Sequence, residues 1–239
     1  MKGLMVMRGS MADMEIAYKL IRSRRRTVSI RITGAGGVEV RAPLTMAADE
    51  IERFVRSKGA WIESHLEKTT RKLEKRAAFS LDYGASVPLL GKSYMIEARA
   101  GNNIGYDDRC VFLPPGLAAD EIKQAVILLY RHVAKGYIQD RIREFAPIMG
   151  VSPAAIKING AKTRWGSCSG KNSVNFSWRL IVAPRELVDY VVVHELAHIK
   201  AHDHSPRFWA QVEQVLPDYK TLRRRLKGVH EMLDAQDWG

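Results

Sequence analysis

The sequence predicts an α+β protein of two domains, a β-rich domain over residues 1–114 and a mainly helical domain over residues 115–239. Apolar and polar residues alternate with the period of a strand through much of the first part. Apolar residues at helical spacing dominate the second part, which also has strand patterns for a small antiparallel sheet. Pro114-Pro115-Gly116 interrupts both patterns and marks the expected boundary.

The first domain is predicted to open with a leader and a β-hairpin. Residues 1–14 contain clustered methionines and are expected to be disordered. Residues 28–32 and 38–40 alternate on either side of a glycine-rich turn at 34–37, which is typical of a hairpin.

A helix and a second group of strands complete the first domain. Ile51, Val55 and Ile62 belong to an apolar stripe at helical spacing, which predicts one amphipathic helix from about residue 45 to Arg76. Strand patterns return, with a turn at Gly91-Lys92, over residues 87–90, 94–98 and 111–113.

The second domain is predicted to begin with a long helix over residues 119–145, closed by Pro147 and Gly150. Strands are expected between residues 155 and 182, around a turn at 165–170. The last of them, over 173–182, is also a candidate edge for pairing with an extended peptide. Two further helices are predicted, the first over residues 184–199 and the second from about Ser205 onward.

The composition of the chain limits where the protein can be located and which partners it can bind. The chain has no apolar run of about 20 residues, so no membrane-spanning helix is expected. Two cysteines form no disulfide framework, which favours a reducing cytoplasm. The net charge of +12 would attract nucleic acid or other polyanions. The basic residues are scattered and lack interleaved aromatics, however, so solvated helix faces and strand ends are the favoured interpretation.

The segment His194-Glu195-Leu196-Ala197-His198 carries the chemistry. On a helix, residues four apart lie about 40° from each other and one turn apart, so His194 and His198 can bind one cation together. Neutral imidazole is a preferred ligand of zinc, and Glu195 between them is placed to act as a general base. The pattern therefore predicts a catalytic zinc site.

The third ligand is expected to be His204. An unbroken helix would carry it about 15 Å along the axis from His194, so the chain must leave the helix after about Ile199. Ser205-Pro206 supports such a break, because it is typical of an N-cap followed by the first residue of a new helix. His202, and Glu213 on the following helix, remain alternative ligands.

Around this motif the chain resembles the YgjP-like metallopeptidase family, which is distantly similar to SprT-like proteases. The resemblance covers nearly the whole length, and the residues that carry it are Arg41-Ala42-Pro43, Lys58-Gly59-Ala60-Trp61-Ile62, Leu90-Gly91-Lys92, and the segments 163–168, 179–184, 189–198 and 204–209. It implies a zincin-like second domain, with His194, His198 and His204 as zinc ligands and Glu195 as base.

Three functions follow as hypotheses. In the first, a water molecule activated by zinc and Glu195 attacks a peptide carbonyl, with Arg164 as a candidate contact for the developing negative charge. In the second, the same site acts on a nucleoside triphosphate, since similar proteins have been described as UTP pyrophosphatases. In the third, the zinc is structural and the basic first domain binds nucleic acid or another partner.

Overall fold

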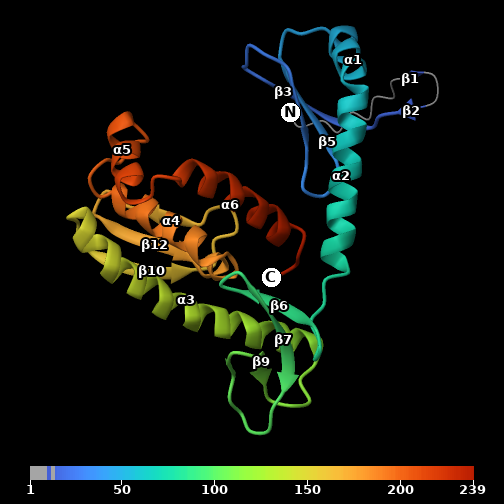
Figure 1. The fold of residues 1–239 in the computed structure, drawn as a ribbon. Coiled ribbons are helices and arrows are strands. Elements are labelled where there is room, and N and C mark those ends of the chain that lie inside the picture. The colour runs from blue at the N-terminus through green and yellow to red at the C-terminus, as the bar shows by residue number, and fades with distance from the viewer. Residues whose placement is uncertain (1–9, 12–13) are drawn as a thin grey trace. The chain divides into compact units, whose positions relative to one another are not determined.

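The computed structural model describes residues 10–11 and 14–239, and over these the protein is an α+β structure (Figure 1). The predicted leader lies mostly outside the described residues, although β1 (Ser10–Met11) pairs antiparallel with β2 (Met14–Glu15). The chain divides into two compact units. The first extends to Phe79 and includes Asp234–Asp237, and the second comprises Ser80–Leu233 with Trp238–Gly239.

The first unit is built on a three-stranded sheet in the order β3 (Tyr18–Ser23), β5 (Val38–Pro43), β4 (Ser29–Ile32). β4 and β5 form the predicted antiparallel hairpin, while β3 pairs parallel with β5. Alternate residues of β5 are buried, as expected for a strand with one face on a core.

Two helices, and not the single helix that the sequence predicts, cover this sheet. α1 (Ala48–Ser57) and α2 (Gly59–Ala77) are separated at Lys58, whose φ of −107° and ψ of 10° are not helical. The following glycine has a weak helical preference, which favours a break here. The interruption removes one residue and leaves the apolar stripe intact, so Ile51, Val55 and Ile62 still belong to one core with the strands.

The second unit begins with a sheet of four strands. Their order is β6 (Ser86–Leu89), β7 (Lys92–Ala98), β9 (Cys110–Leu113), β8 (Gly105–Tyr106). β6 and β7 form the hairpin predicted around Gly91, where φ is 78°. A Cβ atom at Gly91 would lie 2.8 Å from Cα of Pro184, so glycine is required both for the turn and for the close approach.

The expected boundary at 114–116 lies inside this second unit. The backbone N–H of Leu90 donates to the carbonyl of Ile181 (2.7 Å), and the buried hydroxyl of Tyr130 donates to the carbonyl of Pro88 (2.6 Å). These bonds join the four-stranded sheet to the helical part that follows it. A Pro-Pro-Gly turn between two packed elements has the same sequence pattern as a linker between domains.

Helix α3 (Ala119–Met149) runs about one turn beyond its predicted end. Pro147 lies in its last turn, and Gly150 ends it in the left-handed conformation, with φ 60° and ψ 44°. Its buried face packs against α4 and the segment before it. Tyr130 on this face contacts the rings of Trp178 and Trp238, with centroids 5.9 and 5.6 Å away.

A small mixed sheet follows, in the order β10 (Ala155–Asn159), β12 (Ser173–Ser177), β11 (Gly166–Cys168). The sequence predicts an antiparallel sheet, but only β11 and β12 pair in that way, whereas β10 and β12 are parallel. The reason is the β11–β12 hairpin, which turns the chain back so that β12 runs in the direction of β10. β12 is paired on both sides, so it is not the expected edge strand, and β10 and β11 are the outer strands of this sheet.

The predicted strand over 173–182 ends at Ser177, and Trp178–Val182 forms a 3₁₀-helix, η1. The alternation of apolar and polar residues predicts a strand with one face toward solvent, but all five residues of η1 are buried. Arg179 creates the misleading pattern. Its side chain is buried over the ring of Trp178, 4.8 Å from the centroid, and donates to the carbonyl of Gly239 (3.0 Å).

Helices α4 (Arg185–Ala197), α5 (Pro206–Val215) and α6 (Tyr219–Asp234) complete the second unit. α4 packs against α3, α5 and β11, and most of its residues are buried. Among the residues that the structure describes, no helix is both long enough and apolar enough to cross a membrane.

Candidate metal centre

Helix α4 presents His194 and His198 on one face, as their spacing predicts, with the ring centroids 4.9 Å apart. Its last residue is Ala197, and His198 is the C-cap residue. The backbone N–H of Ala201 still bonds to the carbonyl of Ala197 (3.1 Å), after which the chain leaves the helical path. The break therefore follows directly after the second imidazole.

The returning loop brings His204 back to α4. Ser205 is the N-cap residue of α5 and Pro206 its first residue, as predicted, although the Ser205 side chain makes no capping bond. The backbone N–H of Ser205 donates to the carboxylate of Asp203 (3.4 Å). In this conformation Nε2 of His204 lies 3.2 Å from Nε2 of His194.

The three imidazoles fit one divalent metal ion. Their candidate ligand nitrogens, on His194, His198 and His204, all lie within 4.8 Å of one another. Zinc–nitrogen bonds of about 2.0–2.1 Å at tetrahedral angles separate two ligand nitrogens by about 3.3 Å. The ring of His198 is also oriented: its Nδ1–H donates to the carbonyl of Ala201 (3.1 Å), because a carbonyl can only accept, and this leaves Nε2 free to bind a metal.

Two aromatic residues of α5 hold this cluster. Phe208 is fully buried, and its ring centroid lies 4.5–4.9 Å from the centroids of all three imidazoles. Trp209 stacks on His204 at 5.6 Å and on Tyr219 at 5.1 Å. These contacts fix the position of an otherwise exposed His204.

Glu195 lies beside the cluster in a buried position. The residue is 6% exposed, and its Oε2 has no hydrogen-bond partner among the described residues. Burial raises the pKa of Glu195 to about 8, an effect that the positive charge of Arg164 opposes. Burial, together with the charges of His198 and His204, lowers the pKa of His194 to about 3, so this imidazole is neutral, as a metal ligand must be.

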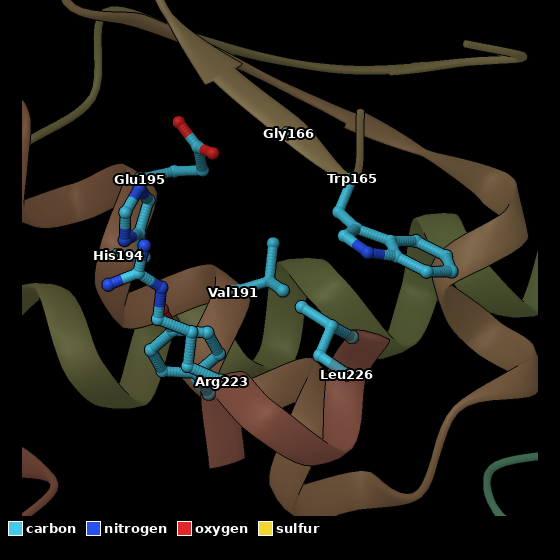
Figure 2. Close-up of a pocket in the computed structure, with 8 residues that line it drawn as sticks. Trp165, Gly166, Val191, His194, Glu195, Arg223 and Leu226 are labelled. Atoms are coloured by element: carbon cyan, nitrogen blue, oxygen red, sulfur yellow. The ribbon is translucent and has the colours of Figure 1, made fainter. Parts of the chain in front are cut away.

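A pocket of about 260 Å³ opens next to His194 and Glu195 (Figure 2). Gly166 of β11 forms part of its wall, and a Cβ atom there would lie only 2.6 Å from Cγ and Oε1 of Glu195. The residues that line the pocket are Trp165, Gly166, Tyr190, Val191, His194, Glu195, Arg223 and Leu226.

The other residues predicted for the site lie outside the cluster. His202 is exposed in the loop, and Glu213 is exposed on α5, and the structure brings neither of them into the group of three imidazoles. Arg164 is exposed just before β11, where its charge acts on Glu195.

Sequence reasoning missed Tyr190 and Arg223 as residues of the pocket. Tyr190 precedes His194 by one helical turn and is 4% exposed, so it has the pattern of a core residue. Arg223 belongs to a basic run at 223–225, which is typical of a solvated helix face. No local signal distinguishes it from its neighbours, because its position depends on how α6 packs.

Comparison with known proteins identifies the family. Residues 26–228 match the profile of the YgjP-like metallopeptidase domain. The chain belongs to the YgjP-like metallopeptidase family. Membership implies a divalent metal ion, usually zinc, and a peptide or protein substrate.

Two crystal structures are similar to part of this YgjP-like protein. The metallopeptidase zymogen abylysin of Pyrococcus abyssi is 27% identical, with 37% of this chain and 90% of that chain covered, at a TM-score of 0.35. The metallopeptidase zymogen jannalysin of Methanocaldococcus jannaschii is 22% identical, with 40% and 96% covered, also at 0.35. No curated protein matches the chain significantly.

Proposed function

We propose that the protein is a zinc-dependent peptidase in which His194, His198 and His204 hold the metal ion and Glu195 transfers protons. One observation carries the proposal. Three imidazole nitrogens approach within 4.8 Å of one another beside a buried carboxylate whose Oε2 lacks a partner among the described residues. Membership of a metallopeptidase family supports the same chemistry.

The protein's own groups divide the work of peptide hydrolysis. His194, His198 and His204 would hold the zinc ion, which would supply Lewis-acid chemistry by lowering the pKa of water and polarising a carbonyl. Glu195 accepts a proton from the attacking water and delivers it to the departing amine. Burial of Glu195 raises its pKa and so favours the protonated form that delivers a proton, whereas the positive charge of Arg164 favours the carboxylate that accepts one. Arg164 supplies positive charge beside Glu195 and is the candidate contact for the developing oxyanion.

Replacing Glu195 by glutamine tests the assignment. The variant is expected to keep one zinc per chain, because all three imidazoles remain, and to lose peptidase activity by at least about 100-fold. Glu213→Gln is the matched control, since Glu213 is exposed on α5 and lies outside the imidazole cluster. Full activity in Glu195→Gln, or loss of zinc in Glu213→Gln, would contradict the proposed roles.

Substrate assays with one zinc-loaded preparation separate the other hypotheses. Cleavage of peptides that requires Glu195 supports the proposal. Release of pyrophosphate from UTP without peptide cleavage would replace it with a nucleotide hydrolase. A preparation that hydrolyses neither, and that binds DNA with a steep salt dependence, would indicate a structural zinc site.

A further inference from the structure

The pocket beside Glu195 has apolar walls and one cationic side chain. Trp165, Val191 and Leu226 supply apolar surface, and Arg223 of α6 lines the same space. Figure 2 shows the guanidinium group of Arg223 extending toward His194, and both residues line the pocket. An arginine therefore faces the space in which a substrate of this site must lie.

The guanidinium group of Arg223 packs over an aromatic ring of α5. Its guanidinium carbon lies 5.2 Å from the centroid of the Trp209 ring, the same ring that stacks on His204. Within the described part of the chain no carboxylate oxygen lies within 4.0 Å of its nitrogens. Arg225, two residues further along α6, does form an ion pair, with Glu186 at 2.6 Å. The hydrogen-bonding edge of Arg223 is thus available to a ligand.

The charge of the pocket favours an anionic ligand. Glu195 is the one carboxylate among the lining residues, and a divalent cation at the imidazoles more than offsets its charge. A guanidinium group binds a carboxylate through two parallel hydrogen bonds, which gives both strength and a defined orientation. Arg223 and Glu195 line one small pocket. A carboxylate that is bound by Arg223 would therefore belong to a substrate residue close to the bond that is cleaved.

We propose that Arg223 binds a carboxylate of the peptide substrate, so that the enzyme prefers peptides with a negative charge next to the bond that it cleaves. The carboxylate is either an acidic side chain or the free C-terminus of the peptide. This inference rests on the proposed peptidase function. Arg223 acts in it as a specificity-determining residue that leaves the proton transfers to Glu195.

Two matched pairs of peptides test the proposal with the full-length, zinc-loaded protein. One pair carries Glu or Gln beside the cleaved bond, and the other ends in a free carboxylate or an amide. Arg223→Gln is compared with Arg224→Gln, because the guanidinium group of Arg224 donates to Oγ1 of Thr221 (3.2 Å) and Arg224 is not a lining residue of the pocket.

The wild type is expected to cleave the charged member of at least one pair with a kcat/KM about 10- to 100-fold above that of the neutral member, the range for one hydrogen-bonded charge pair. Arg223→Gln should lose this preference, so that it cleaves the charged and the neutral member of the pair with similar kcat/KM, and Arg224→Gln should keep it. The pair that shows the preference identifies the source of the carboxylate. An equal loss on charged and neutral peptides, or a wild type without preference, overturns the proposal.

A binding measurement separates this inference from the proposed function. Calorimetric titration of the four peptides into zinc-loaded Glu195→Gln protein requires no cleavage. Tighter binding of a charged peptide that weakens about tenfold or more when Arg223→Gln is added supports the role of Arg223 even if no peptide is hydrolysed. Equal binding of charged and neutral peptides overturns it even if the enzyme proves to be a peptidase.

Discussion

Replacement of Gly166 by alanine is expected to inactivate the enzyme while its metal ligands remain intact. The new Cβ would lie 2.6 Å from Cγ and Oε1 of Glu195 and 2.8 Å from Cδ. Cγ cannot swing aside like the end of a flexible surface chain, because Glu195 is buried beneath β11. Either the carboxylate or the strand must therefore move.

The size of the effect follows from this overlap. Forcing an extra methyl group into a packed interior costs about 1–3 kcal/mol. For a protein of this size, about 2–4 °C of Tm is lost per kcal/mol, so a decrease of about 2–12 °C is expected. A displacement of about 1 Å in a catalytic group lowers kcat by about 100-fold. The zinc content should not change, since the three atoms nearest to the new Cβ all belong to Glu195.

Three measurements on the purified Gly166→Ala variant test this prediction: elemental analysis for zinc, thermal denaturation, and kcat/KM on a peptide that the wild type cleaves. Gly170→Ala is the control, because a Cβ at Gly170, in the β11–β12 turn, would meet nothing within 4 Å. The reasoning fails if Gly166→Ala behaves like Gly170→Ala, or if it loses zinc together with activity.

Two further perturbations address the metal centre and its support. Phe208→Ala removes a fully buried ring that contacts all three imidazoles. The free energy of unfolding, measured by urea denaturation, should therefore fall by about 3–5 kcal/mol. A loss below about 1 kcal/mol would contradict this packing role. Chelation should lower the Tm of the wild type, because the metal binds the folded protein in preference to the unfolded chain. The Tm of His204→Ala should fall much less on chelation. A wild-type Tm that does not change when the chelator is added would argue against a metal at these residues.

The histidine helix could be predicted from sequence because its signals are local. The spacing of His194 and His198 defines one helical face, and Ser205-Pro206 marks the start of the next helix. Together they require a loop between the helices, and this loop carries His204 to the other two imidazoles. Each step depends on residues fewer than about four helical turns apart.

Other features depend on contacts that are distant in sequence. Arg179 has the pattern of a solvent-facing strand residue, yet its partner is the carbonyl of Gly239, 60 residues further along the chain. The assignment of the 86–113 sheet to the second unit likewise depends on bonds such as that between Leu90 and Ile181. Arg223 shares a basic run with two neighbours, and only the packing of α6 places it against the pocket. Periodicity carries no information about such pairings.

The tip of the β6–β7 hairpin packs against the N-terminal end of α4, the helix that carries His194. Gly91 touches Pro184, the residue immediately before α4, and His194 follows ten positions later, about 15 Å up the helix axis. Over that length a tilt of only about 4° at the base swings the upper end sideways by about 1 Å. A larger side chain at this distant turn would therefore displace the imidazoles of α4 from their ligand positions, although none of the histidines has been replaced.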